Sequence, residues 1–287
     1  MASRPAGERL ASAFAAARTQ RRALLIGYLV AGDPDPTTTE LMVAAIADAG
    51  LDVLELGLPY GDPIADGPTI AQAAQRALDQ GFSIGDYLGA AERAAARLPV
   101  VLFTYYNPIH SFGVNAFALR AGALGADGVI VPDLSLEEAS PLREALLEQG
   151  LAMPLLVAPT TPSGRAGRIV SASSGFVYLV SRRGVTGESQ GPGRERLEQQ
   201  LRELRQGPLP VAVGFGISRP GQVSWISARA EGVIVGSALV ASPAGARGME
   251  AARRAAQLVD QLRPALARPR PELSPAASPP ASGAAGA

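Results

Sequence analysis

Short apolar segments recur along the chain, and each is followed by a stretch with apolar residues at helical spacing. The segments are short and mostly unalternating, which is typical of parallel strands covered on both faces. They predict strands at residues 24–30, 53–57, 100–105, 128–131, 153–157, 177–181, 211–214 and 232–236. Eight strand–helix units favour an α/β fold, a (β/α)8 barrel of the TIM type, with a doubly wound open sheet as the structural alternative.

Helices are predicted between these strands, including 37–49, 69–79, 84–97, 136–149 and 196–205. Near the amino terminus Leu10, Phe14 and Ala17 lie at helical spacing, which predicts an extra amphipathic helix ahead of the barrel. The same Ala/Ser/Arg-rich segment also fits a transit peptide, although it contains Glu8 and lacks an apolar core.

The 287-residue chain is 47% hydrophobic, which suits one large α/β domain or two smaller ones. Residues 268–287 are rich in Pro, Ala and Ser and have little apolar surface to bury. We therefore expect one barrel domain over residues 1–267, followed by a disordered tail with no function of its own.

Composition excludes several kinds of chemistry. Net charge is zero and no apolar run is as long as a membrane span, so nothing favours a nucleic acid or a membrane as partner. There is no cysteine, and the single histidine, His110, excludes a multi-histidine metal centre. All 26 basic residues are arginines, so no internal lysine can form a Schiff base. Chemistry at a carbon–carbon bond would depend on carboxylates, phenols and backbone dipoles.

The segment LELGLPYGDPIADGPT, residues 54–69, places two carboxylates near one strand end. Glu55 lies in an apolar strand, where a carboxylate is costly to bury without a partner or a task. Asp66 follows in a Gly/Pro-rich loop that can return over the strand end. Two acidic groups in different environments at one mouth suit acid–base chemistry. On spacing alone, a structural glutamate and a helix-capping aspartate are the commoner arrangement.

Further polar residues fall at predicted carboxyl ends of strands, where the catalytic groups of a barrel belong. They are Asp33 after the first strand, Tyr105, Tyr106 and Asn107 at the third, and Tyr178 on the sixth. His110 has no neighbour that would orient it as a base and is interpreted as a loop residue. Trp225 is interpreted as a packing residue on an outer helix.

Glycines after the last two strands predict a phosphate site. Loops at these two positions of a barrel often hold phosphate on backbone N–H groups. Gly216 and Gly236 would let the backbone approach the anion, and Ser237 would add a hydroxyl. The loop at 184–187 would close over the site, with Thr186 and Gly187 as donors. The arginines at 182 and 183 equally fit a solvated surface.

Together these motifs resemble the tryptophan synthase alpha subunit family. The segment at 54–69 is similar to the family's signature region, and AGDPDP, VPDLSLEE, APTTP, YLVSRRGVTG, GFGIS and VIVGSALV are further matches. The likeness runs from about Glu8 to Leu262. Gly61 stands where the family often has serine, and Arg183 where a small residue or threonine is frequent. These two departures concern loop closure and remove no catalytic group.

The resemblance implies a lyase of tryptophan biosynthesis that cleaves indole-3-glycerol phosphate to indole and glyceraldehyde 3-phosphate. It implies Glu55 as the acid–base catalyst, Asp66 as the partner of the indole N–H, and Tyr178 in the pocket beside Glu55. The implied substrate-binding residues are Tyr28, Phe103, Tyr105 and Ile130 around the indole, with Thr186, Gly187, Phe215, Gly216, Gly236 and Ser237.

The residues agree with this chemistry. A retro-aldol cleavage needs an electron sink, and without a lysine the substrate itself must provide it. Indole does so once its C3 atom is protonated. Glu55 in an apolar site would retain a proton for that step near neutral pH, and Asp66 would stabilise the cation.

The resemblance also implies a cytoplasmic enzyme with no cofactor and no metal, joined to a beta subunit in an αββα heterotetramer that receives the indole. One alternative is a free-standing lyase that releases indole. Another is a weakly catalytic phosphate-ligand barrel that activates a partner, which the presence of Glu55 and Asp66 disfavours. Topology alone also admits a phosphosugar isomerase.

Overall fold

The computed structural model describes residues 6–181, 192–214 and 216–268. Eight parallel strands in these residues form one sheet that curls into a nearly closed barrel, which confirms the TIM fold over the open sheet. The strands are β1 (Leu24–Val30), β2 (Val53–Gly57), β3 (Val100–Phe103), β4 (Gly128–Ile130), β5 (Leu155–Val157), β6 (Val177–Val180), β7 (Val211–Gly214) and β8 (Gly232–Val235).

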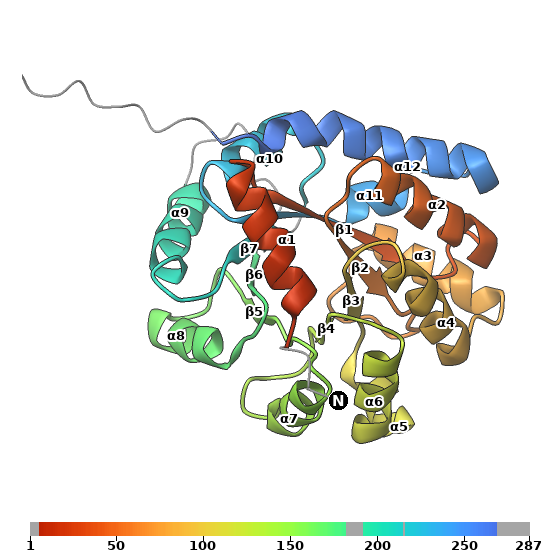
Figure 1. Ribbon diagram of the computed structural model, residues 1–287, viewed down its shortest axis with the longest axis horizontal. Helices are drawn as coiled ribbons and strands as arrows, with labels where there is room; N and C mark the ends of the chain where they lie inside the picture. Colours follow the sequence, from red (N-terminus) through yellow and green to blue (C-terminus); the bar gives the residue numbers. More distant parts are fainter. Residues whose placement is uncertain (1–5, 182–191, 215, 269–287) are drawn as a thin grey trace, which may run out of the picture.

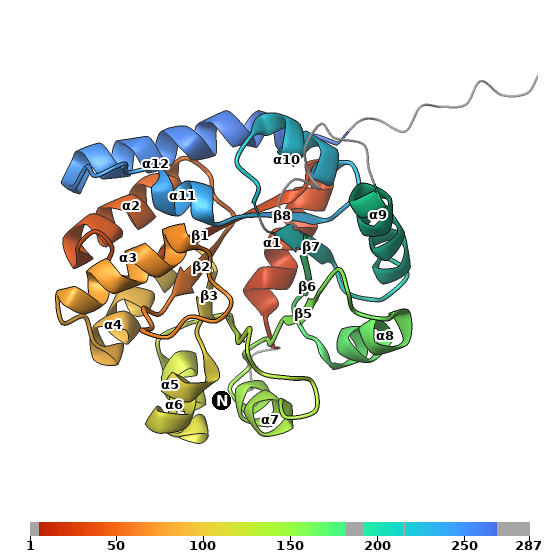
Figure 2. The same cartoon turned by 180° about the vertical axis from the view of Figure 1, so that it is seen from behind.

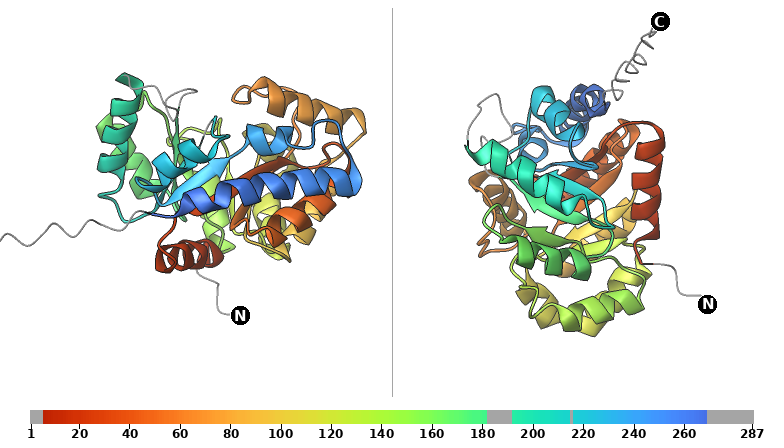
Figure 3. Two further views of the ribbon diagram at one scale, coloured as in Figure 1. Left: turned by 90° about the horizontal axis from the view of Figure 1, so that it is seen from above. Right: turned by 90° about the vertical axis from the view of Figure 1, so that its left-hand side faces the viewer.

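Helices join successive strands and cover the outside of the barrel (Figure 1). They are α1 (Glu8–Thr19), α2 (Pro36–Asp48), α3 (Pro68–Asp79), α4 (Ile84–Ala95), α5 (Tyr106–Phe112), α6 (Val114–Ala123), α7 (Ser140–Glu148), α8 (Ser163–Ala172), α9 (Pro192–Leu204), α10 (Pro220–Ser227), α11 (Ser237–Ala241) and α12 (Gly248–Leu262), followed by the 3-10 turn η1 (Arg263–Leu266). The long helix α12 packs along α2 (Figures 1 and 3).

The barrel closes between its two shortest strands, β4 and β5. Seven neighbouring strand pairs form regular parallel ladders in the order β4-β3-β2-β1-β8-β7-β6-β5. The remaining gap is bridged at Gly128 and Ala152, where Val129 N–H donates to the Ala152 carbonyl at 2.9 Å. Because all the strands are parallel, their carboxyl ends meet on one face of the molecule.

Helix α1 closes the opposite face, at the amino ends of the strands. Leu10, Phe14 and Ala17 are the buried residues of this helix and pack into the interior cluster of the barrel. Phe14 reaches Gly232, the first residue of β8, where a β-carbon would lie 3.3 Å from the Phe14 ring. The predicted amphipathic first helix is therefore confirmed, and it fills the end of the barrel away from the strands' carboxyl ends.

Helices α3 and α11 lie side by side at the carboxyl-end face (Figure 2). Ala73 and Ala74 of α3 pack against Tyr28, Val30 and Val240, which places α3 over the mouth of the barrel. None of the helices in the described ranges is both long and apolar enough to cross a membrane.

Several predicted boundaries differ from the structure. Tyr105 lies outside β3 and is the N-cap of α5. Helix α7 begins at Ser140, four residues later than predicted. The residues before it form a turn instead, in which the Ser135 hydroxyl donates to the Glu138 carboxylate at 2.8 Å. His110 was interpreted as a loop residue and instead lies within α5. Trp225 lies on α10 as predicted, and the guanidinium groups of Arg194 and Arg229 lie 4.7 Å and 4.5 Å from the centre of its ring.

Candidate active site

A cavity of about 270 Å³ opens at the carboxyl ends of the strands. Every strand of the barrel, or the loop directly after it, contributes to its wall. The lining residues are Tyr28, Glu55, Ala65, Asp66, Gly67, Thr69, Ile70, Phe103, Pro132, Leu156, Tyr178, Val180, Gly216, Ile234, Gly236 and Ser237. This list contains two carboxylates and no basic residue, so the described part of the wall binds through neutral and acidic groups.

Glu55 projects into this cavity from β2. Its strand neighbours Leu54 and Leu56 belong to the outer apolar cluster, so alternation along the strand turns Glu55 inward. The residue is 1% exposed, and its Oε1 atom has no hydrogen-bond partner among the described residues. Burial raises the pKa of Glu55 from 4.5 to about 8. The Glu55 carboxyl group is therefore largely protonated near neutral pH, as a general acid requires.

Asp66 faces the same cavity from the loop between β2 and α3. The N-cap of α3 is Gly67, so Asp66 is not the helix-capping aspartate that its spacing also allowed. Tyr105 holds this part of the loop, because its hydroxyl bonds to the Asp66 carboxylate and accepts the Ala65 N–H at 3.0 Å. Burial raises the pKa of Asp66, and the Tyr105 hydrogen bond opposes that rise.

Two buried tyrosines flank Glu55. Tyr28 on β1 is the register partner of Glu55, and its ring meets Phe103 edge-on at 5.4 Å between centroids. Tyr178 approaches from β6, and its hydroxyl lies over Gly214, where a β-carbon would overlap it. Burial, and then the nearby acidic groups, raise the pKa of both phenols well above the usual value. Both phenols therefore stay neutral and provide apolar faces with a polar tip.

Small residues line the cavity at the ends of β7 and β8. Gly216, after β7, has a left-handed backbone with φ +69°, which favours glycine. Gly236 and Ser237 follow β8, and Ser237 is the first residue of α11. These three residues line the cavity together, as the predicted phosphate site requires.

Most of the expected site residues that the structure describes line one cavity. Ile130 is instead fully buried in the interior cluster, Tyr105 interacts with Asp66 without lining the cavity, and Asp33 is not among the lining residues. Three expected residues, Thr186, Gly187 and Phe215, lie outside the described residues, as does the loop at 184–187.

The sequence did not point to eight of the wall residues, all apolar or small: Ala65, Gly67, Thr69, Ile70, Pro132, Leu156, Val180 and Ile234. Leu156, Val180 and Ile234 lie on strands. Their side chains could have been predicted to point into the barrel if the pairing register of these strands had been known from the sequence. Thr69 and Ile70 belong to the first turn of α3, which folds over the barrel, and no pattern in the sequence signals that placement.

Comparison with known proteins gives a consistent result. The family model described as tryptophan synthase alpha chain matches residues 14–266. The chain is 46% identical over 250 residues to the tryptophan synthase alpha chain of Geobacillus kaustophilus, covering 86% of this chain and 87% of that protein. It is 46% identical over 235 residues to the alpha chain of Synechococcus elongatus, covering 80% and 88%.

Solved structures agree with the sequence relatives. The chain superposes on an open form of M. tuberculosis tryptophan synthase, with BRD0059 bound, at a TM-score of 0.82 and 36% identity. That match covers 90% of this chain and 98% of the other. The alpha chain from Legionella pneumophila gives a TM-score of 0.80 at 32% identity, covering 90% and 97%.

Proposed function

The chain belongs to the tryptophan synthase alpha chain family, and on that basis we propose which of its residues carry out the family's reaction. The reaction is the cleavage of indole-3-glycerol phosphate to indole and glyceraldehyde 3-phosphate, a lyase step of tryptophan biosynthesis. The lining residues and their protonation states provide the roles that follow.

Glu55 acts first as an acid and then as a base. The protonated carboxyl group donates its proton to C3 of the indole ring, which forms an indoleninium cation. The resulting carboxylate accepts the proton of the hydroxyl on the carbon attached to C3. The bond between that carbon and C3 breaks, its electron pair returns to the ring, and the former alcohol leaves as the aldehyde. The proton count balances, and Glu55 ends the step protonated, which its pKa of about 8 favours.

Asp66 binds the indole N–H and stabilises the cation. The positive charge of the indoleninium ion is shared with the ring nitrogen, so an ionised carboxylate there is favourable in a partly buried site. Tyr178 packs beside Glu55, and Tyr28 and Phe103 form an apolar wall for the ring.

The phosphate binds at the small-residue rim. Gly216, Gly236 and Ser237 offer backbone N–H groups and a hydroxyl, and the family resemblance adds Thr186 and Gly187, which lie outside the described residues. Neutral donors of this kind hold phosphate without a lysine or an arginine. The substrate therefore spans the cavity, with its ring between Glu55 and Asp66 and its anion at the ends of β7 and β8.

One observation supports this assignment above the others: a fully buried carboxyl group, with Oε1 unpartnered in the described structure, lies in the same cavity as a second carboxylate. The test is indole release from indole-3-glycerol phosphate by the wild type and by Glu55→Gln. Cleavage should fall by roughly 10²–10⁴-fold, the usual contribution of a general acid–base group. The affinity for indole-3-propanol phosphate, which lacks both side-chain hydroxyls, should change little. Near wild-type turnover in Glu55→Gln would remove Glu55 from the acid–base role, whereas negligible indole release by the wild type as well would favour the barrel that only activates a partner.

The family name implies a beta subunit as the partner, and we infer an αββα complex in the cytoplasm. The loop at 59–68 is the proposed docking point, because it carries Asp66 and exposes Ile64 at 75%. Docking there would order Asp66 and raise indole release without adding a catalytic group.

Size-exclusion chromatography with a beta subunit, together with indole release, tests this partner assignment. Ile64→Asp should weaken co-elution and the stimulation of indole release. Met249→Asp on α12, where the side chain is 71% exposed, is the matched control and should change neither. Full activity of the isolated chain without co-elution would favour the free-standing lyase.

We also propose that the barrel forms a single domain, as the sequence predicts for residues 1–267. Within the described residues one curled sheet and one continuous layer of helices support this assignment. Limited proteolysis should therefore give one resistant fragment of nearly this length.

A further inference from the structure

Asp33, at the end of β1, forms an ion pair with Arg76 on α3. Arg76 Nε donates to Oδ1 at 2.7 Å and Nη2 donates to Oδ2 at 3.0 Å. The Asp33 side chain is 6% exposed and that of Arg76 is 50% exposed. Two parallel hydrogen bonds fix orientation as well as distance. The ion pair therefore holds α3 in a defined position relative to the end of β1.

Two other contacts join the same turn to the same end of α3. Gln80 Nε2 donates to the Pro34 carbonyl at 2.9 Å. The Phe82 ring packs against Gly32, whose φ is +80° and where a β-carbon would lie 2.6 Å from the ring. The last turn of α3 and the residues that directly follow it are thus attached to the turn after β1 by one charged, one polar and one apolar contact.

The other end of α3 forms part of the active-site wall. Gly67, Thr69 and Ile70 line the cavity, and Asp66 directly precedes them. Pro68 at the first helical position marks where the helix begins, but Gly67, the N-cap, makes no side-chain capping bond that would hold this end in place. The position of this end therefore depends on the packing of α3 and on its attachment further along.

The packing of α3 leaves its position along the helix axis weakly determined. The buried residues of α3 are three alanines, Ala73, Ala74 and Ala77, whose short methyl groups interlock only weakly with their neighbours and so resist sliding of the helix poorly. Arg76 lies about 13 Å along the helix from Gly67, at roughly 1.5 Å per residue. A helix of this length moves as one body, so a shift at Arg76 reaches Asp66.

We propose that Asp33 and Arg76 are positioning residues for the lyase reaction, because their ion pair sets the axial position of α3 and thereby the place of the Asp66 carboxylate in the cavity. This proposal rests on the assignment of Asp66 to the indole N–H. It predicts that breaking the ion pair impairs binding and reaction at the indole end of the site, while phosphate binding at the ends of β7 and β8 is unchanged.

The test compares Arg76→Gln, Asp33→Asn and Arg76→Lys with a matched control, Arg22→Gln. Arg22 forms the same kind of two-bonded ion pair with Asp52, and both side chains are 15% exposed. That pair joins the segments before β1 and β2, at the amino ends of the strands. Each variant is measured for kcat and KM, for affinity to indole-3-propanol phosphate and to glycerol 3-phosphate, and for Tm.

Arg76→Gln and Asp33→Asn should lower kcat by roughly 10- to 100-fold, as a displaced reacting group does. They should weaken the binding of indole-3-propanol phosphate but leave the affinity for glycerol 3-phosphate within about twofold of the wild-type value. Only the first ligand has an indole N–H that binds Asp66. Arg76→Lys should be intermediate, since an ammonium keeps the charge but cannot form the paired bonds. The double variant Asp33→Asn/Arg76→Gln should have a kcat no lower than that of the more impaired single variant, because both changes break the same ion pair. Arg22→Gln should lower Tm without changing kcat.

A wild-type kcat in Arg76→Gln would overturn the proposal. Equal losses of affinity for both ligands, together with a lower Tm, would also overturn it, because that result is expected of an ion pair that only stabilises the fold. Failure of the assigned chemistry gives a different result: the wild type itself would not release indole, or Asp66→Asn would turn over normally.

Discussion

The Tyr28 hydroxyl on β1 occupies the space that a β-carbon on Gly57 of β2 would need. Gly57 is the last residue of the strand that carries Glu55. A glycine at this point lets the tyrosine ring lie across the strand end, beside the buried carboxyl group. The close approach of a ring, and not a turn, therefore requires glycine at position 57.

Gly57→Ala should displace the Tyr28 ring and damage the indole pocket. Overpacking of this kind usually costs about 1–3 kcal/mol of stability, and the ring must also leave its place in the wall. We expect weaker binding of indole-3-propanol phosphate by titration and a lower Tm. Gly61→Ser is the control, because the nearest atom to a β-carbon there is Leu78 Cδ1 at 3.8 Å. Wild-type affinity in Gly57→Ala would show that Tyr28 does not shape the pocket.

The buried Glu55 should make stability depend on pH. Its pKa is about 8 in the folded chain and 4.5 in its usual state, so between these values only the folded chain keeps the proton. The free energy of unfolding therefore falls as pH rises through this window, by at most about 1.4 kcal/mol per pH unit from this group. Glu55→Gln removes the dependence. Thermal unfolding from pH 5 to 8 should show the wild type losing stability relative to the variant, and parallel curves would contradict a buried neutral acid.

Activity should have two pH limits. Glu55 must be protonated to donate to the indole, so kcat/KM should fall as pH rises through about 8. Asp66 must be ionised, and burial raises its pKa, so activity should also fall at low pH, above the usual range of an aspartate. The two limits belong to the coupled pair and are read as macroscopic values. A flat alkaline limb would remove Glu55 from the acid role.

Tyr105→Phe should act through Asp66. The variant removes the hydroxyl that bonds the Asp66 carboxylate and accepts the Ala65 N–H. Because this hydrogen bond lowers the pKa of Asp66, its loss should move the acid limb of the pH profile upward and reduce kcat. Tyr106→Phe, at the next position and partly exposed, is the control and should leave the acid limb in place. An unchanged acid limb in Tyr105→Phe would mean that the bond does not tune Asp66.

The pattern of short apolar segments was enough to predict the barrel, because parallel strands covered on both faces leave a strong signal. The bounds of β1, β2 and β7 agree with it. It also located Glu55, since a carboxylate inside an apolar strand is rare. The pattern did not predict where some helices begin. Helix α5, which contains His110, starts directly after Tyr105, and its first N–H group, that of Tyr106, donates to the Asp133 carboxylate in a distant loop.

Contacts between distant segments account for the rest. The sequence placed Asp33 at the end of the first strand but gave no sign of its partner Arg76, and only the fold of α3 over the barrel brings the two together. In the same way, Tyr105 was expected to wall the indole pocket, and in the structure its hydroxyl interacts with Asp66 while the residue lies outside the cavity lining. Local sequence carries no information on such pairings.

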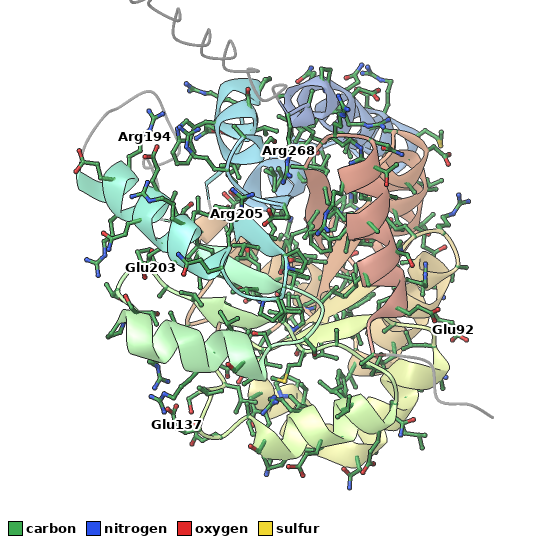
Figure 4. The ribbon with its side chains drawn as sticks, turned by 60° about the vertical axis from the view of Figure 1, so that its left-hand side comes forward. Glu92, Glu137, Arg194, Glu203, Arg205 and Arg268 are labelled. Atoms are coloured by element: carbon green, nitrogen blue, oxygen red, sulfur yellow. The ribbon has the colours of Figure 1, made fainter. Side chains whose placement is uncertain are left out.

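Arg268 provides the last prediction. The sequence assigns it to the Pro-rich tail, yet its Nε donates to the Ser227 carbonyl at 3.1 Å and its Nη2 donates to the Ala230 carbonyl at 2.6 Å. Arg268 and Arg205, both labelled in Figure 4, also share Glu231, at 3.8 Å and 3.1 Å, directly before the first residue of β8. The main chain continues the attachment, because Arg268 N–H donates to the Arg21 carbonyl at 3.0 Å. We therefore expect the folded barrel domain to extend through Arg268, one residue further than the sequence predicts.

Arg268→Ala should lower the free energy of unfolding by about 1–3 kcal/mol, because two backbone carbonyls lose a charged donor. Arg268→Lys should recover only part of this loss, since one ammonium cannot reach both carbonyls in the same geometry. Neither variant should alter kcat, because these contacts lie at the amino ends of the strands, away from the cavity. A chain that ends at Arg268 is the matched control, and the composition of the removed segment predicts an unchanged Tm. If that truncation cost as much stability as Arg268→Ala, the tail and not the Arg268 side chain would carry the effect.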